Sequence, residues 1–406
     1  MTGEARTSDS DEQPLEGLTV LDASRVLVGP FCTMQLGDLG AEVIKIERPD
    51  GGDQTRGWHP PTYGDESAYY VSVNRNKRSL TLNLASEEGR EVFRDLASEA
   101  DVLVENFRVG KMDEWGLDYE TLSAENPELV YCSLSGYGEW GPHKDRPAYD
   151  IMMQAEGGLM SITGEEGGPP VRVGVAIADI GAGMYATQAI LAALLYRELG
   201  DGTGQKVDVS LLDGQVAWMS YMASYYFATG DPPGRMGSKH PTIAPYQAFE
   251  TTDGYVVVAT ASENLWPKFC RAIDREDLVD DDRFAVNADR VENRSELDRI
   301  LNDEFESYST AEAVARMEEA GVPASRVCDM EDVFENPQVQ ARDMHRTVEH
   351  PTIGSVEMAG SPMHFSRTPT AIDRHPPQLG EHTESVLREF GYDDETIEEM
   401  AARDIV

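Results

Sequence analysis

The first part of the chain alternates short apolar runs with amphipathic stretches, which is the pattern of repeated strand and helix units. In residues 86–100, for example, the apolar side chains recur at helical spacing after Ser86, a residue type that caps helix amino termini. Apolar runs that predict buried strands occupy residues 18–24, 41–47, 79–84, 101–106 and 129–136. This alternation predicts an α/β fold with a doubly wound, mainly parallel sheet.

The pattern changes in the second half of the chain. Residues 246–260 predict a β-hairpin that turns at Asp253 and Gly254, and acidic helical segments fill residues 264–320. Short strands, proline-rich turns and a last helix near 382–402 follow. The change predicts a second, smaller α+β domain.

The chain is too long for one ordinary hydrophobic core, so we expect it to divide. The amino-terminal residues 1–13 are polar and acidic and predict a disordered tail. We place the large α/β domain at residues 14–225 together with 329–406, and the small domain at 226–328.

Charge adds a second kind of information. The chain carries 74 acidic and 34 basic residues, a net charge of −40, and only 7 of the basic residues are lysines. The acids are scattered among apolar periodic segments, which predicts a folded protein with an acidic surface rather than a disordered chain. Such a surface suits a salt-rich cytoplasm, so we expect a halophile's protein, and its like charge argues against nucleic acid as a partner.

Several further site classes are not expected. The four cysteines lie far apart without a CxxC pair, which argues against a disulfide framework or a zinc site and fits a reducing cytoplasm. The amino terminus does not resemble a secretory signal. The longest helix-like apolar run, residues 184–196, is too short to span a bilayer, so we expect no membrane contact.

Basic residues gather in three places, each of which we expect at the carboxyl end of a sheet strand. Open α/β sheets bind ligands at that edge, and clustered cations suit a small molecule that carries phosphates. Local ion pairs with the many acids explain any single one of these residues equally well. The clusters comprise Arg75, Lys77 and Arg78 in NRNKRS, Lys45 and Arg48 in VIKIERP, and Arg108 and Lys111 in NFRVGK.

Asp179 is the most conspicuous carboxylate in an apolar setting. It lies in VGVAIADIGAGMYATQAI, just before Gly181, Gly183 and a helix expected to end near Leu199. Capping is the commonest use of an aspartate at such a position. A reactive role is also possible, because a helix amino terminus keeps a carboxylate ionised and the two glycines leave room for a bulky electrophile.

GYGEWG, at residues 136–141, matches the G-x-G-x-x-G fingerprint of dinucleotide-binding proteins and follows a predicted strand. The next residues, PHKDRP, do not open a helix in the register that would direct amides at a pyrophosphate. The motif therefore predicts no nicotinamide or flavin site.

A set of ordered blocks resembles the class III CoA-transferases, the family of formyl-CoA and carnitine CoA-transferases and of α-methylacyl-CoA racemase. The resemblance runs from about residue 14 to the carboxyl terminus. The blocks are VLDASRVLVGPFCTMQLGDLGAEVIKIERPDGGDQTRGW, NRNKRSLTLNL, DVLVENFRVG, SGYGEWGPHKDRPAYDIMMQAEGG, AIADIGAGM and LGEHTESVL. The resemblance implies an interlocked homodimer.

The resemblance also implies roles for residues. Asp179 falls on the family's nucleophile, which forms a covalent acyl and then CoA adduct without a metal or any cofactor besides the CoA substrate. The expected CoA contacts are Arg48, Lys77, Arg78, Arg108, Lys111 and Tyr149.

Departures from the family pattern bear on the substrate. Leu27 stands where formyl-CoA transferase has a glutamine, and GRMGSKHPTIAPY replaces a run of glycines, so formate and oxalate are not expected. Arg235, Lys239 and His240 in that segment could receive the second carboxylate of a dicarboxylic acid, and a solvated basic loop is the equal alternative. We expect succinyl-CoA as donor and mesaconate, citramalate or malate as acceptor.

Two alternatives stay open. Racemases of the family use a histidine where this chain has Tyr149, and a phenol is a poor base at neutral pH, which favours the transferase. Glu263, in the region of the racemase's other acid–base group, keeps that activity possible. The other alternative hypothesis is a non-catalytic relative that binds acyl-CoA.

Overall fold

The computed structural model describes residues 12–406, which form two compact units. Unit 1 runs to Leu159 and resumes over Val173–Tyr221 and Gln338–Val406. Unit 2 comprises Met160–Arg172 and Met222–Pro337. Its main segment thus begins and ends at other residues than the predicted small domain at 226–328, and it includes a further short segment, Met160–Arg172. The tail predicted at residues 1–13 falls almost wholly outside the described residues.

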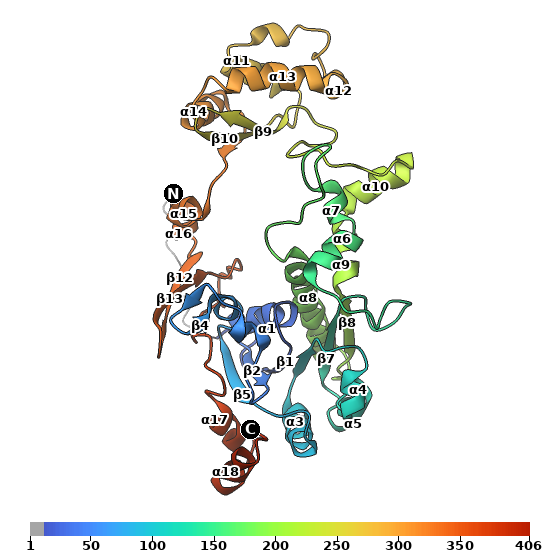
Figure 1. Cartoon of the computed structure of the whole chain (residues 1–406), viewed down its shortest axis with the longest axis vertical. Coiled ribbons are helices and arrows are strands. Elements are labelled where there is room, and N and C mark those ends of the chain that lie inside the picture. The colour runs from blue at the N-terminus through green and yellow to red at the C-terminus, as the bar shows by residue number, and fades with distance from the viewer. Residues whose placement is uncertain (1–11) are drawn as a thin grey trace. The chain divides into compact units, whose positions relative to one another are not determined.

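Unit 1 is built on a six-stranded sheet in which every neighbouring pair is parallel (Figure 1). The strand order is β5-β2-β1-β6-β7-β8, so the chain leaves β1 in one direction and later returns to its other side with β6. This reversal is the topological switch point of a doubly wound sheet. The strands are β1 Thr19–Ala23, β2 Glu42–Glu47, β5 Lys77–Thr81, β6 Val102–Glu105, β7 Val130–Ser135 and β8 Lys206–Ser210.

Helices cover both faces of this sheet because successive strand residues point to opposite sides. In β1, Leu21 joins one buried cluster with Phe93 of α3 and Leu387 of α17, whereas Val20 joins the other with α1 and α8. The helices of the first face are α3 Glu87–Glu99, α4 Lys111–Trp115, α5 Tyr119–Glu125, α17 Thr383–Glu389 and α18 Asp394–Ala402. Those of the second face are α1 Val28–Asp38, α8 Ile177–Leu199 and α9 Leu211–Trp218.

Helix α8 is longer than its apolar run predicted. Its 23 residues are long and apolar enough to cross a membrane by length and composition, so the expectation from residues 184–196 was wrong on length. Half of its most apolar window is buried inside the structure, where Ala182, Ala186 and Ile190 are fully covered. The buried side of the helix packs against α1 and α9.

The other elements of unit 1 are short. They lie around the strand ends and along the carboxyl-terminal segment. That segment returns to β5, where the His382 amide donates a hydrogen bond to the Ser79 carbonyl. They are the 3-10 helix η1 Gln54–Gly57, β3 Thr62–Tyr63, β4 Glu66–Ser67, α2 Ala68–Ser72, α6 Asp150–Glu156, β12 His345–His350 and β13 Gly354–Ala359. Three helices lie at the unit limits: α7 Leu159–Ile162, α10 Ser220–Thr229 and α16 Pro337–Ala341.

Unit 2 has its own core around an antiparallel three-stranded sheet, order β11-β10-β9. The predicted hairpin turn at Asp253 and Gly254 is confirmed, because Gly254 pairs with Thr251 at the end of the ladder. Phe249 and Phe305 stack at the centre of this core. The elements are β9 Tyr246–Thr251, β10 Gly254–Ala259, α11 Trp266–Ala272, η2 Glu276–Leu278, α12 Asn287–Glu292, α13 Arg294–Phe305, α14 Thr310–Ala320, β11 Ala324–Arg326 and α15 Met330–Glu335.

Local signals predicted some boundaries well and others poorly. The Ser86 hydroxyl accepts a hydrogen bond from the Gly89 amide, so the predicted cap of α3 is confirmed. The single helix predicted at 382–402 is wrong, because α17 and α18 are separated at Gly391, which takes a left-handed φ of 90°. A residue without a side chain adopts that conformation readily and ends the first helix.

Candidate active site

The loops that follow β1 and β6 meet at the switch point of the sheet. The Arg25 amide donates to Asn106 Oδ1 at 2.8 Å, and Asn106 Nδ2 donates to the Arg25 carbonyl at 2.7 Å. The Arg25 guanidinium lies 4.8 Å from the centre of the Phe107 ring. These contacts fix the two loops at the sheet edge where doubly wound folds bind ligands.

Two cavities open on either side of this junction. The first, which we call the Arg48 cavity, has a volume of about 680 Å³, and the second, the Asp179 cavity, about 440 Å³. Arg25, Gln54 and Phe107 line both, so the cavities adjoin. We refer to the two neighbouring cavities together as the recess.

The Arg48 cavity lies beyond the ends of β1, β2 and β5. Arg48 directly follows β2, is exposed, and donates from Nε to the Gly52 carbonyl at 3.1 Å. The wall also contains apolar surface from Leu82, Leu84 and Trp115. An apolar recess with an exposed guanidinium at its rim suits a ring system that carries a phosphate.

The Asp179 cavity collects several of the predicted residues. Leu27, Arg108 and Tyr149 line it together with Asp179. Tyr149 is 63% exposed and Leu27 only 7%, so the cavity has one buried apolar wall and one open side. Arg108 is paired with Glu114 at the surface.

Asp179 is not the helix cap that the sequence predicted. Helix α8 begins at Ile177, its cap position is Ala176, and Asp179 lies inside the first turn. The capping role belongs to Asp150, whose Oδ1 accepts the Ala178 amide at 2.8 Å. The Asp179 carboxylate is therefore not occupied in capping.

The electrostatic setting of Asp179 also differs from the expectation. Burial, and in second place the charge of Asp150, raise the pKa of Asp179 from 3.8 to about 7. The expected effect of the helix terminus, an ionised carboxylate with an ordinary pKa, is outweighed because desolvation and a like charge both disfavour the charged form. The protonation state of Asp179 therefore changes near neutral pH in the free protein.

The two glycines after Asp179 serve helix packing rather than substrate access. A Cβ atom on Gly181 would lie 2.3 Å from the Trp218 ring, and one on Gly183 would lie 2.8 Å from the Val28 carbonyl oxygen. Both positions are buried. The prediction that they leave room for a thioester is wrong, since they let α8 approach α9 and α1.

The basic cluster around β5 is the second correction. Lys77 and Arg78 begin β5, so they lie at its amino end and not at a carboxyl end. Lys77 is fully buried, with Nζ 2.9 Å from Asp22 Oδ2 and 2.9 Å from the Pro30 carbonyl. Arg78 donates to both carboxylate oxygens of Glu389. Neither residue lines the two cavities.

Lys111 also lies outside the two cavities. Its ammonium group contacts Glu114 at 2.9 Å and the Trp115 ring at 4.6 Å. Of the expected CoA contacts, the structure therefore places Arg48, Arg108 and Tyr149 on the recess and gives Lys77, Arg78 and Lys111 internal or surface partners.

The remaining predicted substrate residues belong to unit 2. Arg235 donates to the Gly168 carbonyl, and Lys239 pairs with the buried Asp298 at 2.9 Å. Burial, followed by the nearby charge of Arg294, lowers the pKa of His240. Lys239 is thus already neutralised within the described structure.

Glu263, the residue that kept the racemase alternative open, also lies in unit 2. Its two oxygens accept the Asn287 amide at 2.7 Å and Arg290 Nη2 at 2.9 Å. Burial opposes ionisation, but these two donors outweigh it and lower the pKa of Glu263. An ionised, paired carboxylate is a weak proton acceptor.

Sequence reasoning missed three cations on the recess. Arg25 lies at the junction of the cavities, and Lys144 and Arg146 line the Asp179 cavity from the loop after β7. Arg146 pairs with Glu156 at 3.0 Å. The signal was present in PHKDRP, a basic stretch at residues 142–147 in a chain poor in lysine.

No group of three or more histidine, cysteine or carboxylate side chains able to hold a metal ion occurs among residues 12–406. The four cysteines are free, and only Cys328 is exposed. Burial, as the main cause, raises the pKa of Cys32 to about 12, so its thiol is not ionised near neutral pH. Asp179, by contrast, lines the second cavity with a carboxylate whose pKa lies near neutral pH.

Comparison with known proteins gives one consistent result. The family model described as CoA-transferase family III matches residues 15–383. Succinyl-CoA:glutarate CoA-transferase of Homo sapiens is 42% identical over 406 residues, which are 100% of this chain and 92% of that protein. Succinyl-CoA:mesaconate CoA-transferase of Haloarcula hispanica is 39% identical over an alignment of 387 residues, and the match covers 93% of this chain and 96% of that protein.

A solved structure agrees in fold. The crystal structure of a CAIB/BAIF family protein from Brucella suis superimposes with a TM-score of 0.84 at 40% identity, and the match covers 93% of this chain and 100% of that one.

Proposed function

This chain belongs to CoA-transferase family III, and on that premise we propose that it moves CoA from succinyl-CoA to a dicarboxylic acid through covalent intermediates on Asp179. The acceptors we propose are C4 or C5 dicarboxylates such as mesaconate, citramalate or malate. Glutarate joins this set because a relative that matches the full length of the chain is named for it.

The observation that carries the proposal is that Asp179 lines a cavity which shares Arg25, Gln54 and Phe107 with the larger Arg48 cavity. The Arg48 cavity would take the adenosine end, with Arg48 near a phosphate. Arg25 would lie beside the diphosphate at the junction, and the thioester would reach Asp179 in the second cavity. Arginine side chains suit phosphates because their donors are charged and paired.

The chemistry follows from a carboxylate nucleophile. An Asp179 oxygen attacks the thioester carbonyl, the C–S bond breaks, and a mixed anhydride and free CoA thiolate result. The thiolate then attacks the Asp179 carbonyl, which releases the donor acid as its carboxylate and leaves an aspartyl-CoA thioester. An oxygen of the acceptor carboxylate then attacks the aspartyl-CoA carbonyl, the C–S bond breaks, and a second mixed anhydride and free CoA thiolate result. The thiolate attacks the acceptor's acyl carbonyl, which forms the product thioester and releases Asp179 as its carboxylate.

The raised pKa of Asp179 sets a condition on this sequence. Only the ionised form attacks, and burial with the Asp150 charge holds the pKa near 7 in the free protein. A buried carboxylate is also more weakly solvated, which makes it a better nucleophile once it is ionised. The first step should therefore accelerate as the pH rises through 7.

The family also implies a homodimer, which we propose for this chain. Helix α8 leaves Leu195, Tyr196 and Leu199 exposed, and α10 has no buried residue while its Phe227 is 79% exposed. Apolar side chains in such numbers indicate surfaces that another protein covers. We likewise propose a salt-rich cytoplasm as the setting of this acidic chain.

A panel of CoA donors and carboxylate acceptors, assayed by product mass in molar KCl, tests the function. We expect succinyl-CoA with a dicarboxylate to give the highest rate, and Asp179→Ala to abolish it. Asp280→Ala, which removes an exposed acid of unit 2, is the matched control and should keep full activity. Full CoA transfer by Asp179→Ala would show that Asp179 is not the nucleophile. Binding of acyl-CoA without transfer for any pair of donor and acceptor would favour the non-catalytic alternative.

A further inference from the structure

The turn between β1 and α1 holds an unusual residue. Val26 takes a φ of 70°, in the left-handed region that β-branched residues avoid. The turn also carries Arg25, which lines both cavities, and Leu27, which lines the Asp179 cavity beside Val26. A conformation of this kind persists only where its surroundings impose it.

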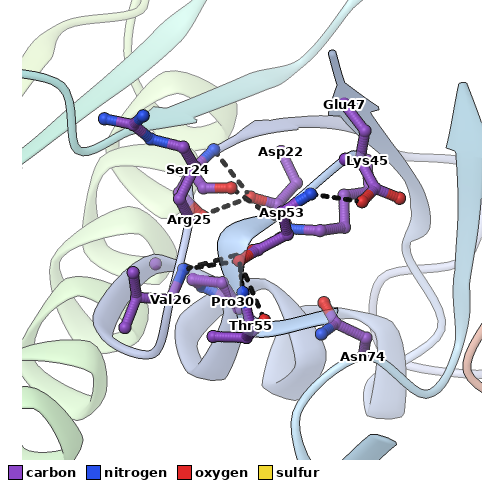
Figure 2. Close-up of polar contacts among 12 residues, drawn as sticks. Asp22, Ser24, Arg25, Val26, Pro30, Lys45, Glu47, Asp53, Thr55 and Asn74 are labelled. Atoms are coloured by element: carbon purple, nitrogen blue, oxygen red, sulfur yellow. Dashed lines mark hydrogen bonds and ion pairs between the residues drawn. The ribbon is translucent and has the colours of Figure 1, made fainter. Parts of the chain in front are cut away.

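Asp53 supplies that constraint from across the fold (Figure 2). Its Oδ2 accepts the Val26 amide at 3.1 Å, and its Oδ1 accepts the amide and the hydroxyl of Thr55 at 2.9 and 2.8 Å. Asp53 is separated from Val26 by 27 residues, so this is a tertiary contact. The amide of the strained residue therefore donates to the Asp53 carboxylate.

The carboxylate is itself held by a buried ion pair. Lys45 Nζ lies 3.1 Å from Asp53 Oδ2 and donates to the Ser24 carbonyl at 3.1 Å, so one ammonium group joins Asp53 to the start of the same turn. Lys45 is fully buried and Asp53 only 2% exposed. Burial opposes ionisation of Asp53, but Lys45 and Thr55 outweigh it and lower its pKa.

Asp22 completes the far side of the turn. Its Oδ1 accepts the Ser24 amide at 3.0 Å, and its Oδ2 accepts the Thr33 hydroxyl of α1 at 2.8 Å. The turn 24–27 is thus fixed at its first residue by Asp22 and Lys45 and at its third by Asp53. Arg25 and Leu27, which lie on either side of Val26, line the cavities from this fixed turn.

We propose that Asp53 is a positioning residue for CoA transfer: by holding the Val26 amide it fixes the turn that places Arg25 and Leu27 around Asp179. The inference rests on the proposed function, because it concerns the geometry of that site. Asp53 also lines the Arg48 cavity, but it is almost fully buried and its part here is played through the Val26 amide. A residue that maintains a near-attack geometry affects the rate of the chemical step more than the affinity for substrate.

The simplest competing explanation is that Asp53 only stabilises the fold. Val26 separates the two, because glycine adopts a positive φ without strain and needs no carboxylate to hold it there. If Asp53 acts through the conformation of Val26, replacing Asp53 should cost less activity in a Val26→Gly protein than in the wild type. A loss caused by general destabilisation would be the same in both.

The experiment is a double-mutant cycle of Asp53→Asn and Val26→Gly, with kcat and KM for succinyl-CoA measured at a temperature where melting curves show all four proteins folded. We expect Asp53→Asn to lower kcat by about 10- to 100-fold with a much smaller change in KM. In the Val26→Gly background the same substitution should lower kcat by less than a third of that factor. Equal factors in both backgrounds, or an unchanged kcat, would overturn the proposal.

Thr55→Val provides a second variant should Asp53→Asn fail to fold. It preserves the Lys45 pair and removes only the hydroxyl that orients the Asp53 carboxylate. We expect a several-fold loss of kcat, again reduced by Val26→Gly, and an unchanged kcat would count against the proposal. Wild-type protein assayed alongside separates the proposed CoA transfer from the positioning role of Asp53. If the wild type transfers no CoA, both proposals are wrong. If the wild type transfers CoA and the variants are unaffected, only the positioning role is wrong.

Discussion

Asp150→Asn is the perturbation that most sharply probes the environment of Asp179. The substitution removes the charge that faces Asp179, and the asparagine oxygen can still accept the Ala178 amide that Asp150 now accepts at 2.8 Å. The amino terminus of α8 should therefore keep its cap while the electrostatic repulsion disappears. Asp150→Glu, which retains the charge, is the matched control.

The structure sets the size of the effect. The pKa of Asp179 is raised from 3.8 to about 7, with burial as the larger cause and Asp150 as the smaller. Removing the smaller cause should lower the pKa of Asp179 by less than half of this rise, so the pKa in the variant should stay above the ordinary value of 3.8. At pH 6 the variant should therefore hold a larger ionised fraction of Asp179 than the wild type does.

The assay is the pH dependence of single-turnover adduct formation from succinyl-CoA, trapped with hydroxylamine between pH 5 and 8.5. We expect a wild-type midpoint near 7, a lower midpoint for Asp150→Asn, and a midpoint near 7 for Asp150→Glu. A flat wild-type profile over this range would show that Asp179 does not titrate there. Identical midpoints for wild type and Asp150→Asn would show that the Asp150 charge does not raise the pKa of Asp179.

The same pKa has a consequence for stability. Unfolded aspartate ionises near 3.8 and folded Asp179 near 7, so the folded state binds the extra proton in this window and loses stability as the pH rises through it. Asp179→Asn should accordingly raise the melting temperature at pH 8 and leave it nearly unchanged at pH 4. The opposite pH dependence would show that Asp179 is stabilised as the anion.

Three further predictions concern packing, ligand binding and salt. Gly183→Ala should destabilise the protein by about 1–3 kcal/mol in chemical denaturation, because the new Cβ would lie 2.8 Å from the Val28 carbonyl, and an unchanged midpoint would contradict the close contact. Arg48→Ala should weaken CoA binding at least several-fold by calorimetry, whereas Lys111→Ala, outside both cavities, should not. The melting temperature should rise strongly between 0.1 and 3 M KCl as salt screens the net charge of −40, and equal stability would contradict the halophilic interpretation.

The fold was largely predictable because its signals are local. Apolar runs separated by amphipathic helices predicted the parallel sheet, and Ser86 predicted a helix start, since both patterns lie within a few neighbouring residues. The break between α17 and α18 was missed, although Gly391 carries the signal, because glycine inside a helical pattern is often tolerated.

The candidate site was less predictable because its determinants are distant in sequence. Asp179 was identified, but its exact place within the first turn of α8 depends on where the chain first becomes helical. Lys77 looked like part of a phosphate-binding patch until its partner Asp22, 55 residues away, showed that the ammonium group is internal. Trp218, which occupies the space beside Gly181, is equally remote.

The raised pKa of Asp179 could not have been predicted from the sequence either. A carboxylate in the first turn of a helix is expected to be stabilised as the anion. Burial and the facing Asp150 outweigh that effect, and both arise only from the tertiary structure.

Mass spectrometry of the peptide that contains Asp179 is the direct test of whether CoA transfer passes through covalent intermediates on this residue. The enzyme is mixed with succinyl-CoA and a dicarboxylate acceptor, quenched during turnover, and treated with borohydride or hydroxylamine to convert an activated aspartyl group into a stable derivative. We predict that Asp179 alone carries the modification. Sustained CoA transfer with unmodified Asp179, or exchange of the α-proton with deuterated solvent in the absence of CoA transfer, would contradict it.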